Sequence, residues 1–150
     1  MEKQTVRILH IEDTAAEAML IHKLFEGTRS IKIDITWVRS LTDGLKRLAE
    51  EKFDVVLTDL QLPDSYGMGT FRLVQDHALH LPIVLLTNID EPQMSLNAIQ
   101  SGAQDYWLKS RIDTFMMEAR LRFAIERHRI SSELRQGYEK RIRELGQRSG

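Results

Sequence analysis

The sequence predicts an α/β fold in which a five-stranded parallel sheet carries helices on both of its faces. Short apolar runs alternate with amphipathic stretches, and the runs at residues 53–57 and 83–86 are rich in branched side chains. Such runs are typical of parallel strands that are covered on both faces. Strand and helix alternate five times, which predicts a doubly wound sheet with right-handed crossovers. In such sheets ligands bind beyond the carboxyl ends of the strands.

The strands are expected where the apolar runs lie, at residues 6–11, 33–38, 53–57, 83–86 and 106–108. The first helix is predicted after the first run, because Thr14 and Glu17 match a capping box, in which hydroxyl and carboxylate satisfy each other's backbone donors. Ala16, Leu20 and Leu24 are expected to form the apolar stripe of this helix.

Three further helices have start signals of their own. Ser40 and Asp43 form a second candidate capping box before the second helix. The third helix is expected after a turn that contains Gly67 and Gly69. Pro92, with two acidic residues before it, opens the fourth helix, where the missing N–H and the helix dipole suit these residues.

A fifth helix is predicted from Asp113 to about Leu145, without a convincing stop signal between them. At about 1.5 Å per residue this rod is on the order of 50 Å long, more than the sheet can cover. We therefore expect one domain over residues 1–125 and a helical extension over residues 126–150. The extension repeats an apolar residue every three or four positions, which is typical of a helix that pairs with a second copy or leads to an output domain. These residues are Ile130, Leu134, Tyr138, Ile142 and Leu145.

The composition excludes several kinds of site. The chain has 150 residues, a formal net charge of -1 and no cysteine. Without cysteine the chain has no disulfide scaffold, thiol nucleophile or thiolate metal site. The near-neutral charge gives no general attraction to nucleic acid or to an anionic membrane, and no apolar run approaches the length of a membrane span. We expect a cytoplasmic protein that binds neither directly.

Polar residues follow four of the predicted strands. They are Glu12 and Asp13 after the first strand, Asp59 after the third, Thr87 after the fourth and Lys109 after the fifth. Because the carboxyl ends of parallel strands share one edge, these side chains are expected to converge there. Gathered carboxylates repel one another, and a hard divalent cation such as magnesium relieves the repulsion. A carboxylate beside such an ion, a lysine and a hydroxyl is equipped to attack a phosphorus centre.

In order and spacing, Glu12-Asp13, Asp59, Thr87, Tyr106 and Lys109 resemble the receiver domain of two-component response regulators. Supporting pieces are Leu62-Pro63-Asp64, Gly67, Pro82-Ile83-Val84 and Gly102-Ala103. The resemblance covers about residues 5 to 125. It implies a flavodoxin-like (βα)5 fold, here with an extended C-terminal helix.

The resemblance also implies a role for each matched residue. Asp59 is expected to accept a phosphoryl group from a sensor histidine kinase or a phosphotransfer protein, and Lys109 to pair with the phosphoryl oxygens. Mg²⁺ is expected on Glu12, Asp13 and Asp59 and on the backbone carbonyl of Gln61. Such a protein assists its own phosphorylation and dephosphorylation, but it is not an enzyme that acts on a separate substrate. It passes the signal to an output domain or effector.

A conformational switch is part of the same resemblance. Thr87 is expected to turn toward the phosphoryl group while Tyr106 moves into the vacated space, which alters the surface of the fourth helix, fifth strand and fifth helix. Asn88 stands where the family usually has a small residue, and we expect it to narrow access to the site. Ser110 stands where proline is frequent, so the isomer of the bond before it is left open.

Two other functions fit parts of the sequence. The helical extension is compatible with a constitutive docking or dimerisation module that acts without phosphorylation. The second function is that of a magnesium-dependent phosphatase with an aspartyl nucleophile. Such a phosphatase usually carries a second aspartate two residues after the nucleophile. This chain has Gln61 at that position, which argues against this function. The extension interleaves arginine with glutamate, which favours a solvated or coiled-coil face over nucleic-acid contact. His10 and Trp107 are expected to be packed residues of the core.

Overall fold

A five-stranded parallel sheet forms the centre of the computed structural model, which describes the backbone of residues 3–148 and the side chains of residues 3–147. The last two residues of the predicted extension, 149 and 150, lie outside the described residues. The sheet has the order β2-β1-β3-β6-β7, as expected for the predicted class. Its strands are β1 (Gln4–Ile11), β2 (Ile31–Val38), β3 (Val55–Thr58), β6 (Ile83–Thr87) and β7 (Asp105–Leu108).

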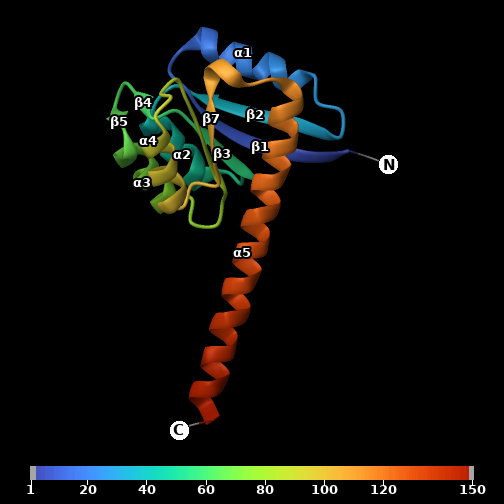
Figure 1. The fold of residues 1–150 in the computed structure, drawn as a ribbon, viewed down its shortest axis with the longest axis vertical. Coiled ribbons are helices and arrows are strands. Elements are labelled where there is room, and N and C mark those ends of the chain that lie inside the picture. Colours follow the sequence, from blue (N-terminus) through green and yellow to red (C-terminus); the bar gives the residue numbers. More distant parts are fainter. Residues whose placement is uncertain (1–2, 149–150) are drawn as a thin grey trace.

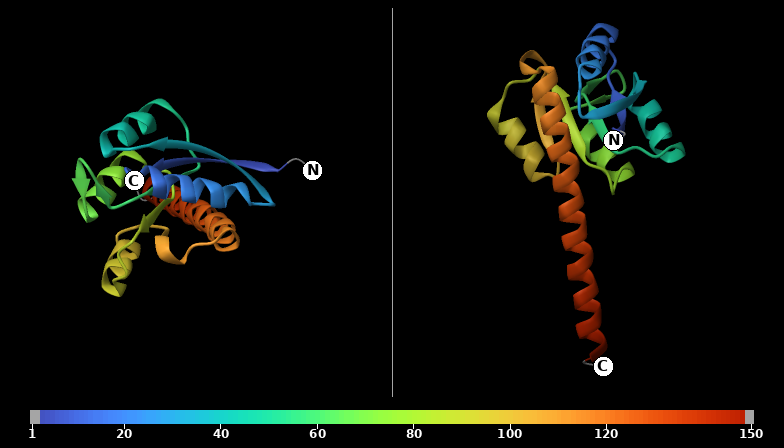
Figure 2. Two further views of the ribbon diagram at one scale, coloured as in Figure 1. Left: turned by 90° about the horizontal axis from the view of Figure 1, so that it is seen from above. Right: turned by 90° about the vertical axis from the view of Figure 1, so that its right-hand side faces the viewer.

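In the described part of the chain, five helices cover the two faces of this sheet (Figures 1 and 2). They are α1 (Ala15–Glu26), α2 (Leu41–Glu50), α3 (Met68–His77), α4 (Pro92–Gln100) and α5 (Thr114–Arg148). Helices α1 and α5 pack on one face, and α2, α3 and α4 pack on the other. Three short elements were not predicted: the antiparallel pair of β4 (Gln61–Leu62) and β5 (Ser65–Tyr66), and the 3-10 turn η1 (Lys109–Arg111).

Each inner strand sends side chains into both layers, which explains the continuous apolar runs. Val55 and Leu57 of β3 face α1 and α5, whereas Val56 faces α2 and α3. All side chains of β3 and β6 are buried. Trp107 is fully buried among residues of α5, as predicted. His10 is also buried, and its Nδ1 lies 3.0 Å from Nε2 of His22.

The predicted apolar stripe of α1 is only partly correct, because Leu24 packs against the core but the rest of the stripe does not. The buried face consists of Ala18, Ile21 and Phe25, whereas the side chain of Leu20 is 54% exposed. Apolar residues lie on most sides of this helix, so periodicity alone could not select the buried face. Contact with the sheet and with α5 made the selection.

Helix α5 is a single 35-residue helix, in agreement with the predicted rod. Its first part is packed, because Met117, Leu121 and Ala124 are fully buried. The remainder leaves the domain and projects away from it (Figure 1). No helix in the described part of the chain combines the length and the apolar character that a bilayer span requires.

Candidate functional site

The carboxyl ends of the central strands place the predicted residues at one edge of the sheet. The parallel register pairs Ile11 with Thr58, so the next residues, Glu12 and Asp59, are neighbours. The same register pairs Thr87 with the last residue of β7, immediately before Lys109. The fold alone therefore brings side chains from four strands to this edge.

Lys109 contacts three carboxylates at this edge. Its Nζ donates to Glu12 Oε2 at 2.6 Å and to Asp59 Oδ2 at 2.7 Å. It also donates to Glu17 Oε2 at 2.7 Å, and Glu17 comes from the first turn of α1. An ammonium group has three protons, so these contacts use all of them. The side chains of Glu12 and Asp59 are buried, whereas that of Glu17 is 34% exposed.

Burial and ion pairing shift the pKa values of this group in different directions. Burial raises the pKa of Glu12 to about 7, although the ammonium of Lys109 opposes this rise. Burial also disfavours the charged form of Lys109, but its bonds to Asp59, Glu12 and Glu17 outweigh that effect and raise its pKa. The pKa of Glu17 is lowered, because contacts with Lys109 and Asn88 outweigh its partial burial.

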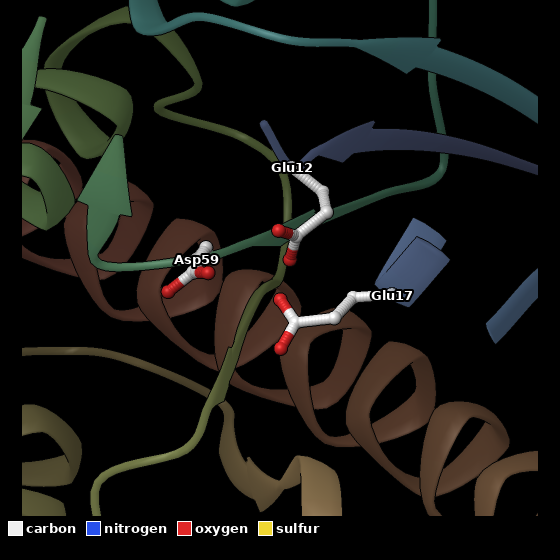
Figure 3. Close-up of side chains that lie close together, drawn as sticks. All are labelled: Glu12, Glu17 and Asp59. Carbon is white, nitrogen blue, oxygen red and sulfur yellow. The ribbon is translucent and has the colours of Figure 1, made fainter. Parts of the chain in front are cut away.

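The three carboxylates fit a divalent cation by their chemistry. Glu12, Glu17 and Asp59 each offer an oxygen within 4.8 Å of the others, and their side chains converge in Figure 3. One ammonium leaves this group with an excess of negative charge when all three are ionised. Hard oxygen donors with excess charge suit Mg²⁺, which needs only one or two carboxylates and keeps several waters.

The hydroxyls of Thr87 and Tyr106 meet the backbone of one residue, Ile89. The Thr87 side chain is buried, and its Oγ1 accepts a bond from the Ile89 N–H at 3.2 Å. The half-buried Tyr106 donates its hydroxyl to the Ile89 carbonyl at 2.8 Å. The loop after β6 is thus connected to both predicted switch residues.

Residues 8–120 match the response regulator receiver domain family. The chain belongs to this family. Regulatory protein LuxO of Vibrio cholerae is 31% identical over 99 residues, which are 66% of this chain and 21% of LuxO. Swarming motility regulation protein RssB of Serratia marcescens is 30% identical over 104 residues, or 69% of this chain and 46% of RssB. The receiver chain therefore spans less than half the length of these curated relatives.

Solved receiver domains share the fold. A response regulator receiver domain protein from Clostridium thermocellum has 26% identity and a TM-score of 0.70, covering 83% of this chain and 98% of that chain. The receiver domain of the Francisella response regulator 1452 has 20% identity and a TM-score of 0.70, covering 81% and 98%. The protein is thus a receiver domain of two-component response regulators, with the flavodoxin-like fold.

Two predicted metal ligands of the receiver lie outside the group of three carboxylates. The side-chain carboxylate of Asp13 has a long contact of 3.5 Å with the Thr14 hydroxyl. The backbone carbonyl of Asp13 accepts a hydrogen bond from the Arg39 guanidinium. The Gln61 N–H donates to Asp59 Oδ1 at 3.1 Å. The metal-binding roles of Asp13 and the Gln61 carbonyl therefore stay predictions.

Sequence reasoning missed Glu17, which it assigned to a capping box with Thr14. Thr14 makes no side-chain capping bond, and Glu17 turns to Lys109 and accepts from Asn88 Nδ2 at 3.0 Å. The available signal was its position in the first turn of the helix that follows β1, because this turn begins at the edge where the ligands gather. The bond between Lys109 and Ser110, left open by the sequence, is trans.

Proposed function

We propose that this receiver accepts a phosphoryl group on Asp59 from a sensor histidine kinase or a phosphotransfer protein in the cytoplasm, and that Mg²⁺ assists. The observation that carries the proposal is the contact of Lys109 with Asp59 and two further carboxylates at the edge of the sheet. This arrangement supplies a nucleophile, a fixed cation and oxygen ligands at one place.

The proposed transfer uses the residues as follows. An oxygen of Asp59 forms a bond to phosphorus while the bond from phosphorus to the donor imidazole nitrogen breaks, and the product is an aspartyl phosphate. Lys109, already 2.7 Å from Asp59, offsets the charge on the equatorial phosphoryl oxygens. Bound Mg²⁺ would add further charge compensation there. Glu12 and Asp59 would hold it, with Asp13 and the Gln61 carbonyl as the family resemblance implies.

The proposed output is a change at the surface of α4, β7 and α5. Thr87 and Tyr106 both hydrogen-bond to the backbone of Ile89. A turn of Thr87 toward the phosphoryl group therefore disturbs the loop to which the Tyr106 hydroxyl is bonded. Phosphorylation in this scheme shifts the balance between two existing conformations by its different contacts with them.

The extension over residues 126–150 is proposed to carry the signal onward, as a connector to an output domain or effector or as a helix that pairs with a second copy. Its apolar residues are exposed along a helix that the domain does not cover. Their exposed fractions run from 45% at Ile130 to 70% at Leu134.

The test is phosphorylation by a small donor. Incubation with acetyl phosphate and Mg²⁺ should add the mass of one phosphoryl group, and Asp59→Asn should abolish the gain. Asp54→Asn is the matched control, because Asp54 lies just before the opposite end of β3 and should leave the gain intact. A gain that persists in Asp59→Asn, or none in the wild type, contradicts the proposal.

A further inference from the structure

Glu17 occupies the exposed side of the phosphoacceptor site. It borders a small pocket of about 170 Å³, together with Asn88, Lys109 and Ser110. One carboxylate oxygen accepts from Lys109 at 2.7 Å and the other accepts from Asn88 at 3.0 Å. Glu17 therefore joins three elements: the first turn of α1, the loop after β6 and the residue that follows β7.

We propose that Glu17 is a positioning residue that restrains Lys109 in the unphosphorylated receiver and, through Asn88, ties the loop after Thr87 to α1. This inference rests on the proposed phosphorylation of Asp59. To bind a phosphoryl oxygen, Lys109 needs an N–H group that is not already hydrogen-bonded. All three of its N–H groups donate to carboxylates in this structure.

The bond to Glu17 is the one that Lys109 can release at the lowest cost. Glu12 is buried and so, before the transfer, is the Asp59 carboxylate; either one would keep a large desolvation cost if it lost its cation. Glu17 is 34% exposed, so water can replace the ammonium. A phosphoryl group on Asp59 would also repel the Glu17 carboxylate, because like charges so close disfavour each other.

Release of Glu17 has a consequence for the loop that carries the switch residue. Asn88 lies between Thr87 and Ile89, and Ile89 contacts both Thr87 and Tyr106. When Glu17 moves away from Lys109, its bond to Asn88 is disturbed as well. Glu17 thus connects Lys109 to the loop after β6, and this connection does not pass through the Thr87 hydroxyl.

The first test measures the initial rate of phosphorylation by acetyl phosphate, with mass spectrometry to follow the product. Mg²⁺ is kept at saturation, so that the loss of one of the three candidate cation ligands does not limit the rate. Glu17→Gln removes the charge that competes for Lys109, and we expect phosphorylation to be roughly two- to fivefold faster, the size expected for a partly exposed ion pair. Glu17→Asp keeps the charge but shortens the arm, so it cannot span Lys109 and Asn88 together. We expect it to be faster than the wild type as well.

The matched control is Glu26→Gln, which makes the same charge change at the far, exposed end of α1 and should leave the rate unchanged. A Glu17→Gln rate equal to or below that of the wild type overturns the proposed restraint. A Glu17→Asp rate equal to the wild-type rate does so too, because charge at the mouth of the site would then explain the effect without the contact.

The second test needs no phosphorylation, so it separates this inference from the proposed function. Glu17→Ala and Asn88→Ala each remove the tie, and both should speed amide hydrogen exchange over residues 88–91 in the unphosphorylated protein. Glu26→Gln should leave that exchange unchanged. If both alanine variants exchange at the wild-type rate, the proposed link between α1 and the loop after Thr87 is overturned. If acetyl phosphate cannot modify the wild-type protein, the proposed function is contradicted instead.

Discussion

One ammonium, that of Lys109, balances two buried carboxylates and a third at the rim. A carboxylate buried without a partner retains its desolvation cost, so the loss of the lysine costs more than the bonds it makes. The same excess of negative charge, present when all three carboxylates are ionised, would let the cluster hold the proposed Mg²⁺. We therefore expect stability and cation binding to be coupled at these residues.

Replacement of Lys109 by methionine should lower the free energy of unfolding by roughly 3 kcal/mol at pH 7 without divalent cations. Mg²⁺ should recover part of this loss, because it supplies the missing positive charge. Urea unfolding with and without MgCl₂ measures both effects. Lys46→Met, at an exposed position of α2, is the control. A Lys109→Met protein as stable as the wild type would show that the cluster does not need this charge.

A second charged contact, between Asp105 and Arg120, connects β7 to α5. Asp105 accepts from Arg120 Nε at 2.8 Å and from the Trp107 indole at 2.9 Å. Burial disfavours the charged carboxylate, but these bonds outweigh it and hold the pKa of Asp105 below its ordinary value of 3.8. Its contribution to stability is thus present above about pH 4 and is lost as the pH falls through the folded-state pKa.

Asp105→Asn should therefore destabilise the protein by about 1–2 kcal/mol at pH 7, the size of a lost charged hydrogen bond. The difference from the wild type should shrink between pH 7 and pH 3, because below about pH 4 the unfolded wild-type chain takes up a proton that the folded carboxylate resists. Urea unfolding at the two pH values checks this. An equal difference at both values would mean that the contact does not depend on the ionised carboxylate.

At the scale of elements, helix α2 receives its N-terminal cap from two places in the chain. The Ser40 hydroxyl accepts from the Asp43 N–H at 3.1 Å, as the local sequence predicts. Asp64, in the turn between β4 and β5, accepts from the Leu41 and Thr42 N–H groups at 2.9 Å each. The second cap also fixes the loop that follows Asp59 against α2.

Asp64→Ala should lower the free energy of unfolding by roughly 1 kcal/mol, the usual cost of a lost helix cap. Denaturant unfolding measures the loss, and hydrogen exchange at the first amides of α2 should rise in parallel. Asp76→Ala, at an exposed position of α3, serves for comparison. Equal effects of the two substitutions would contradict the capping role.

Whole-molecule shape is set by α5, which is part of the domain at Met117 and Leu121 and exposed at Leu134 and Leu145. A mostly exposed apolar stripe on a projecting helix is stabilised when a partner helix covers it. If a second copy is that partner, one rigid helix joins the surface of the receiver to the dimer contact.

Leu134→Glu should then convert a dimer to a monomer, because it places a charge in the paired stripe. Gln136→Glu adds the same charge on the opposite side of the helix and should leave the dimer intact, since successive residues are about 100° apart. Sedimentation equilibrium distinguishes the two states. A wild-type protein that is monomeric at all concentrations would remove the dimer and leave the connector.

The sequence by itself determined the elements whose signals are local. Continuous branched runs identified β3 and β6, and the uninterrupted helical pattern after Asp113 identified the rod. The strand-end residues Glu12, Asp59 and Lys109 were located because parallel strands end at one edge. These conclusions depend on chain order and periodicity, which the sequence contains directly.

Only the tertiary structure decided which groups meet across long separations. It turned α1 so that Ile21, not Leu20, is buried, and it drew Glu17 away from Thr14 to Lys109, 92 residues later in the chain. The ion pair with Lys109 stabilises Glu17 more than the predicted capping box would. A charge-assisted hydrogen bond to a buried ammonium is stronger than the hydrogen bond of a helix cap. Such competition is settled by geometry that no local pattern encodes.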